Sequence, residues 1–224
     1  MERQAGNRKR RALVVRGGWE GHEPIACTER FLPFLRGRGF AVTVTDALDG
    51  YADPDLLRGT DLIVQCWSEG QLTGEQEAGL CAAVRSGTGF AGWHGGVVST
   101  MQTNLEYQFM VGGRFVCHPG GIIDYTVDTT DDHPTVAGLG SFQVHSEQYF
   151  CHVDPTLDVH ATTTFDAGHG VPEAVGAVMP VVWTRSYGAG RVFVSTLGHV
   201  AADFDQPETR EHVQRGLLWA ARQK

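Results

Sequence analysis

Residues 89–96 read GFAGWHGG, an apolar run that ends in a turn flanked by glycines. A strand that passes through such a sharp turn into a helix presents the side chain at the tip, and this geometry commonly exposes a catalytic nucleophile. The residue at the tip is His94, which is a poor nucleophile. The stretch therefore predicts a strand and a helix of an α/β sheet, with His94 presented for a different kind of chemistry.

Strand and helix patterns alternate around this turn. Short apolar runs predict strands, and amphipathic spacing or capping residues predict helices between them. The predicted strands are 11–18, 40–46, 61–67 and 87–94, and the predicted helices are 24–36, 53–61, 73–85 and 207–222. Nearly all-apolar strands separated by helices are typical of a parallel sheet covered on both faces. We expect an α/β fold with a doubly wound, mostly parallel sheet of the flavodoxin-like kind.

The second half of the chain is richer in strand signals. After Gly113, the runs IIDYTVDTT, LDVHATTTF and PVVWTRSYGAGRVFVSTLG contain many β-branched residues, and YGAGR at 187–191 marks a hairpin turn. We therefore expect extra β-strands in this half. No linker or internal repeat interrupts the chain, so residues 12–224 are expected to form a single domain.

Composition argues against several classes of protein. The chain has 18 basic and 26 acidic residues, and its net charge of -8 does not suit a general nucleic-acid binder. No apolar run approaches the roughly 18 residues that span a bilayer. Five cysteines without a CxxC pair favour reduced thiols in a cytoplasmic protein. Residues 1–11 are expected to be a disordered basic tail, since no apolar segment of a secretory signal follows them.

Polar and aromatic side chains gather just after the predicted strands. In open α/β sheets, ligands bind outside the carboxyl ends of the strands. The residues at these ends are Trp19, Glu20, His22, Glu23, Trp67, Ser68, Glu69, His94 and, after the late run VFVSTLGH, His199. The sequence therefore places histidines, carboxylates and tryptophans along one edge of the sheet.

Six motifs resemble a known family. They are GFAGWHGG, FMVGGRFVCHPGG, DDHPTVAGL, HSEQYF, PVVWTRSYGAGRVFVSTLGHV and GLLWA, in this order. Together they resemble the ThuA family of trehalose-utilisation proteins over about residues 12–221. The resemblance implies a fold similar to that of class I glutamine amidotransferases and a role in carbohydrate breakdown.

The resemblance also indicates an activity that has been lost. In amidotransferase-like domains the turn has the form Gly-x-Cys-x-Gly, and here His94 occupies the position of the cysteine. The catalytic histidine of those domains is followed by Pro-Glu, whereas His199 is followed by Val200 and Ala201. Glutamine hydrolysis needs an activated thiolate. We therefore expect that this chain is not a glutamine amidotransferase.

His94 and His199 are the expected centre of the site, because a histidine pair suits either metal ligation or acid–base chemistry near neutral pH. Glu147 in HSEQYF is expected to assist as a catalytic carboxylate. The residues expected to contact substrate are Trp19, His22, Glu23, Trp67, Glu69, His118, His145 and Tyr149. The histidines expected to be exposed and without a role are His152, His160, His169 and His212.

A divalent cation, Zn²⁺ or Mn²⁺, is the cofactor that this residue set suits. The expected ligands are His94, His199 and His118, with His22, His145 and Glu147 as further candidates. The glycine-rich segments FMVGGRF and HPGGI match neither the P-loop nor the dinucleotide fingerprint, so no nucleotide cofactor is expected.

The expected function is proton chemistry on a carbohydrate, as the resemblance implies. The substrate would be a disaccharide, a glycoside or a keto-sugar derivative, and the reaction an isomerisation, hydration, lyase-type cleavage or hydrolysis. Two alternatives remain open at the level of sequence: a non-catalytic carbohydrate-binding or regulatory module that kept the pocket, and a metal-independent hydrolase with Glu147 as its base. Edge strands in the second half also suit pairing into a homodimer.

Overall fold

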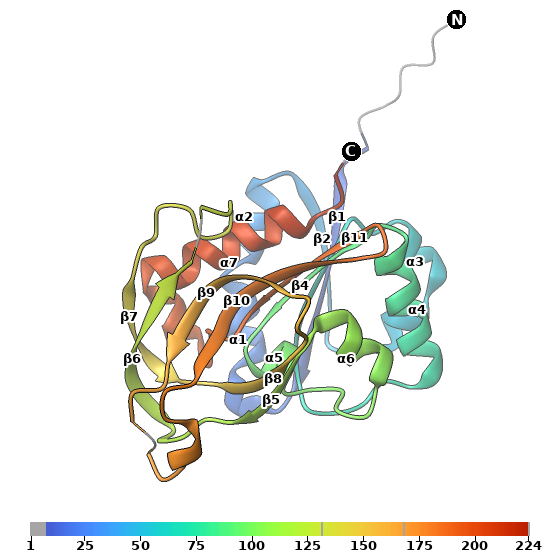
Figure 1. The fold of residues 1–224 in the computed structure, drawn as a ribbon. Coiled ribbons are helices and arrows are strands. Elements are labelled where there is room, and N and C mark those ends of the chain that lie inside the picture. Colours follow the sequence, from blue (N-terminus) through green and yellow to red (C-terminus); the bar gives the residue numbers. More distant parts are fainter. Residues whose placement is uncertain (1–7, 131, 168, 224) are drawn as a thin grey trace, which may run out of the picture.

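The computed structural model describes residues 8–130, 132–167 and 169–223, and it contains one large sheet flanked by helices (Figure 1). The strands are β1 (Arg10–Gly18), β2 (Phe40–Thr45), β3 (Leu62–Ser68), β4 (Gly89–Trp93), β5 (Gly113–Cys117), β6 (Ile122–Thr129), β7 (Phe142–Glu147), β8 (Phe150–Val153), β9 (Asp158–Thr164), β10 (Val178–Tyr187) and β11 (Gly190–Ser195). The helices are α1 (Pro24–Glu29), α2 (Leu32–Gly37), α3 (Pro54–Arg58), α4 (Gly74–Arg85), α5 (Gly95–Val98), α6 (Leu105–Val111) and α7 (Pro207–Ala220). Short 3₁₀ turns are η1 (Glu20–His22), η2 (Asp49–Ala52), η3 (Pro172–Ala174) and η4 (Ala201–Asp205).

The main sheet is mixed, with the strand order β2-β1-β3-β4-β11-β10-β9-β6-β7. Its first five strands in this order run parallel to one another. In β1, Ala12 and Val14 pack with residues of α1, α2 and α7, whereas Leu13 and Val15 pack with residues of α4, α5 and α6. Figure 1 shows α7 on one side of the sheet and α3, α4 and α6 on the other. Burial on both faces explains why β1, β3, β4 and β11 read as nearly continuous apolar runs.

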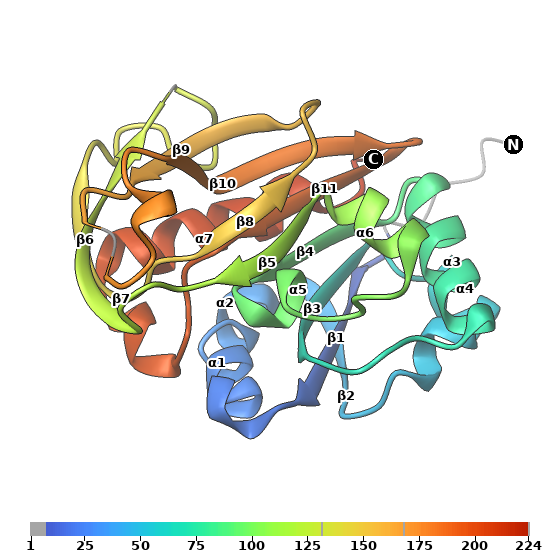
Figure 2. The same cartoon turned by 60° about the horizontal axis from the view of Figure 1, so that its bottom comes forward.

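The second half of the chain continues the sheet with antiparallel strands. β10 pairs antiparallel with β11 and with β9, and β6 pairs antiparallel with β9 and with β7. The hairpin expected at 187–191 joins β10 to β11, with Tyr187 opposite Gly190. β5 and β8 form a separate two-stranded sheet, which Figure 2 shows lying over the main one. The α/β class and the extra strands are confirmed.

Two predicted segments differ from the structure. The single helix expected over 24–36 is divided into α1 and α2, because Pro33 in the first turn of α2 has no N–H group to continue the helical hydrogen bonds. β1 begins at Arg10, inside the segment expected to be a disordered tail, and pairs there with Phe40. Arg8 also bonds the carboxylate of Asp61. The remainder of the expected tail, residues 1–7, lies outside the described residues.

The helices are short, and α7 has 14 residues. Within the described ranges, no helix is both long enough and apolar enough to cross a membrane.

Candidate functional site

The turn after β4 presents His94 near the middle of the sheet. β4 lies between β3 and β11, and α5 begins at Gly95, directly after the turn. His94 has φ 49° and ψ −143°, a backbone conformation that is costly for a residue with a side chain and that clusters at functional sites. Gly96 is needed for the close approach to β3, since a β-carbon there would lie 2.8 Å from Cα of Cys66. His94 is thereby held in one place, and it is only 1% exposed.

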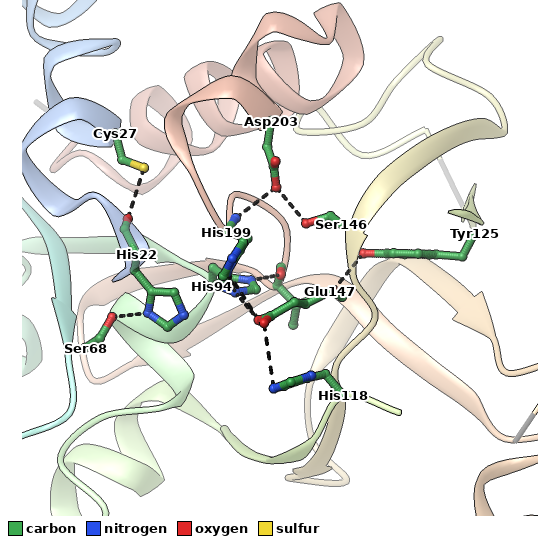
Figure 3. Close-up of polar contacts among 11 residues, drawn as sticks. His22, Cys27, Ser68, His94, His118, Tyr125, Ser146, Glu147, His199 and Asp203 are labelled. Atoms are coloured by element: carbon green, nitrogen blue, oxygen red, sulfur yellow. Dashed lines mark hydrogen bonds and ion pairs between the residues drawn. The ribbon is translucent and has the colours of Figure 1, made fainter. Parts of the chain in front are cut away.

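Glu147 and His199 converge on His94 (Figure 3). Nε2 of His94 lies 3.1 Å from Oε2 of Glu147 and 3.3 Å from Nδ1 of His199. Nδ1 of His199 is also 3.3 Å from the same oxygen of Glu147. Glu147 is the last residue of β7, five positions from β4 in the order of the sheet, and His199 follows β11. Residues far apart in sequence and in the sheet thus meet at one point.

His22 approaches the same point from η1, directly after β1. Its ring centroid lies 4.9 Å from that of His94 and 5.2 Å from that of His199, and the ring is nearly perpendicular to both. Nδ1 of His22 is hydrogen-bonded with Oγ of Ser68 at 2.5 Å, at the end of β3. This contact fixes the ring and leaves Nε2 as the free nitrogen of His22.

A main-chain hydrogen bond fixes the tautomer of His94. The carbonyl oxygen of Thr196 can only accept, so Nδ1–H of His94 donates to it over 2.7 Å. In the neutral ring, Nε2 therefore carries a lone pair. This lone pair faces Glu147 and His199.

Asp203 links the segments that carry Glu147 and His199. Its Oδ2 accepts a hydrogen bond from the backbone N–H of His199 at 2.9 Å and another from the hydroxyl of Ser146 at 2.6 Å. The glutamate that follows the catalytic histidine by two residues in amidotransferase-like domains is replaced here by Ala201, so it offers no carboxylate to His199. Asp203 provides one, although it bonds the backbone of His199.

His118 and Trp19 lie on the exposed side of the cluster. Nε2 of His118 is 3.7 Å from Oε1 of Glu147, and the His118 side chain is 39% exposed. The ring of Trp19 meets His22 edge-on with 4.7 Å between centroids, and Trp19 is 49% exposed. An approaching molecule would meet these two side chains before the buried histidines.

Burial and neighbouring charge set the protonation of the metal-free cluster. Burial lowers the pKa of His22 to about 3 and also lowers the pKa of His94, so both rings are neutral at pH 7. The hydrogen bond with Glu147 raises the pKa of His199. Burial acts to raise the pKa of Glu147, but hydrogen bonds with His199 and His94 outweigh it and hold that pKa well below its usual value. Positive charge in this cluster therefore concentrates on His199.

Four of these side chains have the arrangement of metal ligands. One ligand atom from each of His22, His94, Glu147 and His199 lies within 4.8 Å of the others. Neutral imidazole and carboxylate are common ligands of divalent transition metals. His118, expected as a third ligand, is not in this group, whereas His22, expected first as a substrate contact, is part of it.

Two further predicted site residues adjoin the cluster. Tyr149 is buried, and the centroid of its ring lies 4.1 Å from the centroid of the His94 ring. Tyr149 therefore forms a wall of the site. Burial raises the pKa of Tyr149, which keeps its hydroxyl protonated. Oε2 of Glu23 accepts a hydrogen bond from the backbone N–H of Ala201 at 3.0 Å, so Glu23 supports the segment after His199.

Three other predicted residues are not members of the group of four. Trp67 packs on the backbone of β1, where a β-carbon on Gly17 would lie 2.7 Å from its ring. Glu69 holds its loop through its backbone, with its carbonyl accepting from the hydroxyl of Thr100. His145 is exposed and bonded to Asp124 at 2.8 Å.

A groove of about 630 Å³ between α3 and α4 is lined by none of the predicted site residues.

Sequence reasoning placed Ser68 among the polar residues at the strand ends but missed Asp203 and Ser146. Asp203 lies four residues after His199, so its position alone could have suggested it. Ser146, next to Glu147, carried no such signal. Its role depends on Asp203, which is distant in sequence.

Comparisons with known proteins agree with the fold. A family model described as ThuA, trehalose utilisation, matches residues 11–220. Two solved structures described as ThuA-like are similar over most of both chains: one from Bacteroides uniformis (18% identity, TM-score 0.74, 98% of this chain and 92% of the other) and one from Parabacteroides merdae (17%, 0.76, 97% and 93%). A β-galactosidase from Rahnella is also similar (15%, 0.59), over 95% of this chain and 30% of the other. No curated protein sequence matches significantly.

Proposed function

The chain belongs to the ThuA family, which is described by trehalose utilisation, and from this membership we propose that it is an enzyme of carbohydrate breakdown. Its substrate would be a disaccharide, a glycoside or a keto-sugar derivative. The observation that carries the proposal is the convergence of His94, Glu147 and His199, with contacts of 3.1 Å and 3.3 Å. A strained backbone turn holds His94 of this group at the carboxyl end of β4, where enzymes of α/β folds bind ligands.

The chemistry of these side chains favours proton transfer. Imidazoles and a carboxylate give and take protons, and His94 stands where a nucleophilic cysteine would act in an amidotransferase-like site. Moving a proton next to a sugar carbonyl, or onto a leaving oxygen, needs only such groups. Isomerisation, hydration and elimination belong to this class, and glutamine hydrolysis does not.

His118 and Trp19 suit the entrance of such a site. The partly exposed ring of His118 lies 3.7 Å from Glu147, so it is placed to exchange protons between solvent, substrate and the buried carboxylate. The exposed ring of Trp19 offers an apolar face for the C–H surface of a sugar. We assign proton exchange to His118 and sugar contact to Trp19.

The strand order and the cysteines are consistent with this proposal. The five parallel strands follow the order β2-β1-β3-β4-β11, and we propose that this half shares the doubly wound, flavodoxin-like fold of the amidotransferases. All five cysteines are unpaired. Because thiols stay reduced in the cytoplasm, we propose that the protein acts in such a reducing compartment.

Proton NMR in D₂O tests the function. The protein is incubated with trehalose and with keto derivatives of trehalose and simple glucosides, with and without added Zn²⁺. We expect exchange of the hydrogens next to a carbonyl, or new products, and at least a roughly 100-fold loss of rate in His94→Gln. His152→Gln, which changes an exposed histidine on β8, is the matched control. Sugar binding without exchange or product would contradict an enzyme and favour a binding module.

A further inference from the structure

The four converging side chains point to a cofactor. We propose that His22, His94, Glu147 and His199 form a binding site for one divalent transition-metal ion, with Zn²⁺ as the ion that fits best. This inference deepens the proposed function, on which its role in the reaction rests.

The spacing of three ligand atoms matches a four-coordinate ion. Nε2 of His94, Oε2 of Glu147 and Nδ1 of His199 form a triangle with edges of 3.1, 3.3 and 3.3 Å. Zinc bonds nitrogen and oxygen at about 2.0–2.1 Å, which puts the corners of a tetrahedron roughly 3.3 Å apart. An ion can therefore contact all three atoms without a large movement of any side chain.

Hydrogen bonding within the triangle is incomplete without a cation. Nδ1–H of His94 is committed to the carbonyl of Thr196, so Nε2 of the neutral ring has no hydrogen to donate. It nevertheless lies 3.1 Å from Oε2 of Glu147, which in its ionised form also only accepts. A proton on Nδ1 of His199 can form a good hydrogen bond with only one of these two acceptors, Nε2 of His94 or Oε2 of Glu147. An ion at the centre would satisfy all three lone pairs together.

Outer contacts orient the rings as they do in metal sites. Metal-bound histidines usually direct their second ring nitrogen to a carbonyl, a carboxylate or another polar group. Thr196 serves His94 in this way, and Ser68 serves His22. Both contacts leave the remaining nitrogen of each ring for the ion. Such outer contacts do not arise from the ligand cluster itself, so they are an independent sign of a built site.

The ligand types select the class of ion. Three imidazole nitrogens with one carboxylate oxygen suit Zn²⁺ and neighbouring transition metals, whereas Mg²⁺ and Ca²⁺ prefer oxygen ligands. His118 stays outside the group and partly exposed, so it remains able to carry a proton. A sugar oxygen would then bind as a fifth ligand and be polarised by the ion, while His118 would move the proton.

Metal titration of the full chain tests the site without a substrate. Tag-free protein is stripped with a chelator and titrated calorimetrically with Zn²⁺ and, in parallel, with Mn²⁺. We expect one Zn²⁺ per chain. Titration with Co²⁺ should give the intense visible absorption of a four-coordinate nitrogen and oxygen site.

Variants localise the binding. We expect His94→Gln and Glu147→Gln each to weaken Zn²⁺ binding by more than about 100-fold, and Ser68→Ala to weaken it about 10–100-fold because it removes an outer contact. His118→Gln and the surface variant His152→Gln should bind Zn²⁺ with nearly unchanged affinity. Circular dichroism and thermal unfolding show whether each variant is folded. The titration of the unmodified chain still tests metal binding if one of the variants does not fold.

Absence of Zn²⁺, Co²⁺ and Mn²⁺ binding by the stripped chain would overturn the site, as would full affinity in folded His94→Gln and Glu147→Gln. The two proposals fail separately. Turnover of keto sugars by a protein that binds none of these ions would refute the metal site and keep the enzyme. Stoichiometric metal without sugar turnover would keep the metal site and refute the proposed function.

Discussion

The imidazole of His22 lies directly against the backbone of Gly95, so that a β-carbon at position 95 would stand 2.1 Å from Cε1 of that ring. Gly95 is the first residue of α5 and follows His94 in the turn. The absence of a side chain at Gly95 therefore makes room for His22 beside His94.

Gly95→Ala should displace His22 and weaken Zn²⁺ binding about 10–100-fold, the loss typical of disturbing the surroundings of a metal ligand. The fold should persist, because the clash is with a side chain and alanine is well tolerated in helices. Calorimetric titration measures the affinity. Gly74→Ala, at the first residue of α4 and with no atom within 4 Å of the added carbon, is the control. Equal affinities in both variants would contradict this close packing.

Asp203→Ala should lower both stability and turnover. It leaves the backbone N–H of His199 and the hydroxyl of Ser146 without their acceptor, which costs about 1–3 kcal/mol. Asp203→Asn retains one acceptor oxygen, so its stability and turnover should lie between those of Asp203→Ala and the unmodified chain. Chemical denaturation gives the free energy of unfolding, and the NMR assay gives the rate. A stability equal to that of the unmodified chain would show that this link is unimportant.

Trp19→Ala should raise KM for a sugar substrate and leave kcat nearly unchanged, because an exposed ring that contacts the sugar contributes uniform binding. Zn²⁺ affinity should also stay unchanged, since the ring is not a ligand. Steady-state kinetics and metal titration measure these quantities. A drop in kcat with constant KM would place Trp19 in the chemical step.

His212 should make the stability of the metal-free protein depend on pH. Burial lowers its pKa from 6.5 to about 4, and the ring contacts Ser195 and the carbonyl of Glu208. As the pH falls, His212 therefore takes up a proton in the unfolded chain before it does so in the folded protein. The contribution of His212 is full above about pH 6.5 and is lost progressively down to about pH 4.

His212→Gln tests this contribution by denaturation at several pH values. Removing one titrating group should reduce the slope of the free energy of unfolding by up to about 1.4 kcal/mol per pH unit between these two pKa values. An unchanged slope would mean that His212 is not the titrating group.

The sequence predicted much of the fold because the inner parallel strands are buried on both faces and therefore read as nearly continuous apolar runs. It failed where a single residue overrides a pattern, as Pro33 does between α1 and α2. The expected exposure of His160 and His212 was wrong. Both are buried against hydroxyl groups, of Thr184 and Ser195, that come from other strands. A local window of sequence carries no trace of such partners.

The residues of the cluster were accessible to sequence reasoning to different degrees. His22, His94 and His199 follow strands, so the rule for parallel sheets places them at one edge. Glu147 was found only through the family-like motif HSEQYF, because it ends an antiparallel strand at the far edge of the sheet. That His22 is nearer to the other ligands than His118 depends on the backbone of η1 and Gly95, which spacing does not reveal.

The separation of the ligands along the chain has a consequence for how the protein is made. His199 lies 105 residues after His94, and β11, which precedes it, pairs with β4 in the middle of the sheet. Such distant parallel pairings form slowly, because a long loop must close first. A growing chain that has reached only residue 189 carries three of the four ligands but leaves one side of β4 unpaired. The site therefore assembles last, and it can report on completed folding.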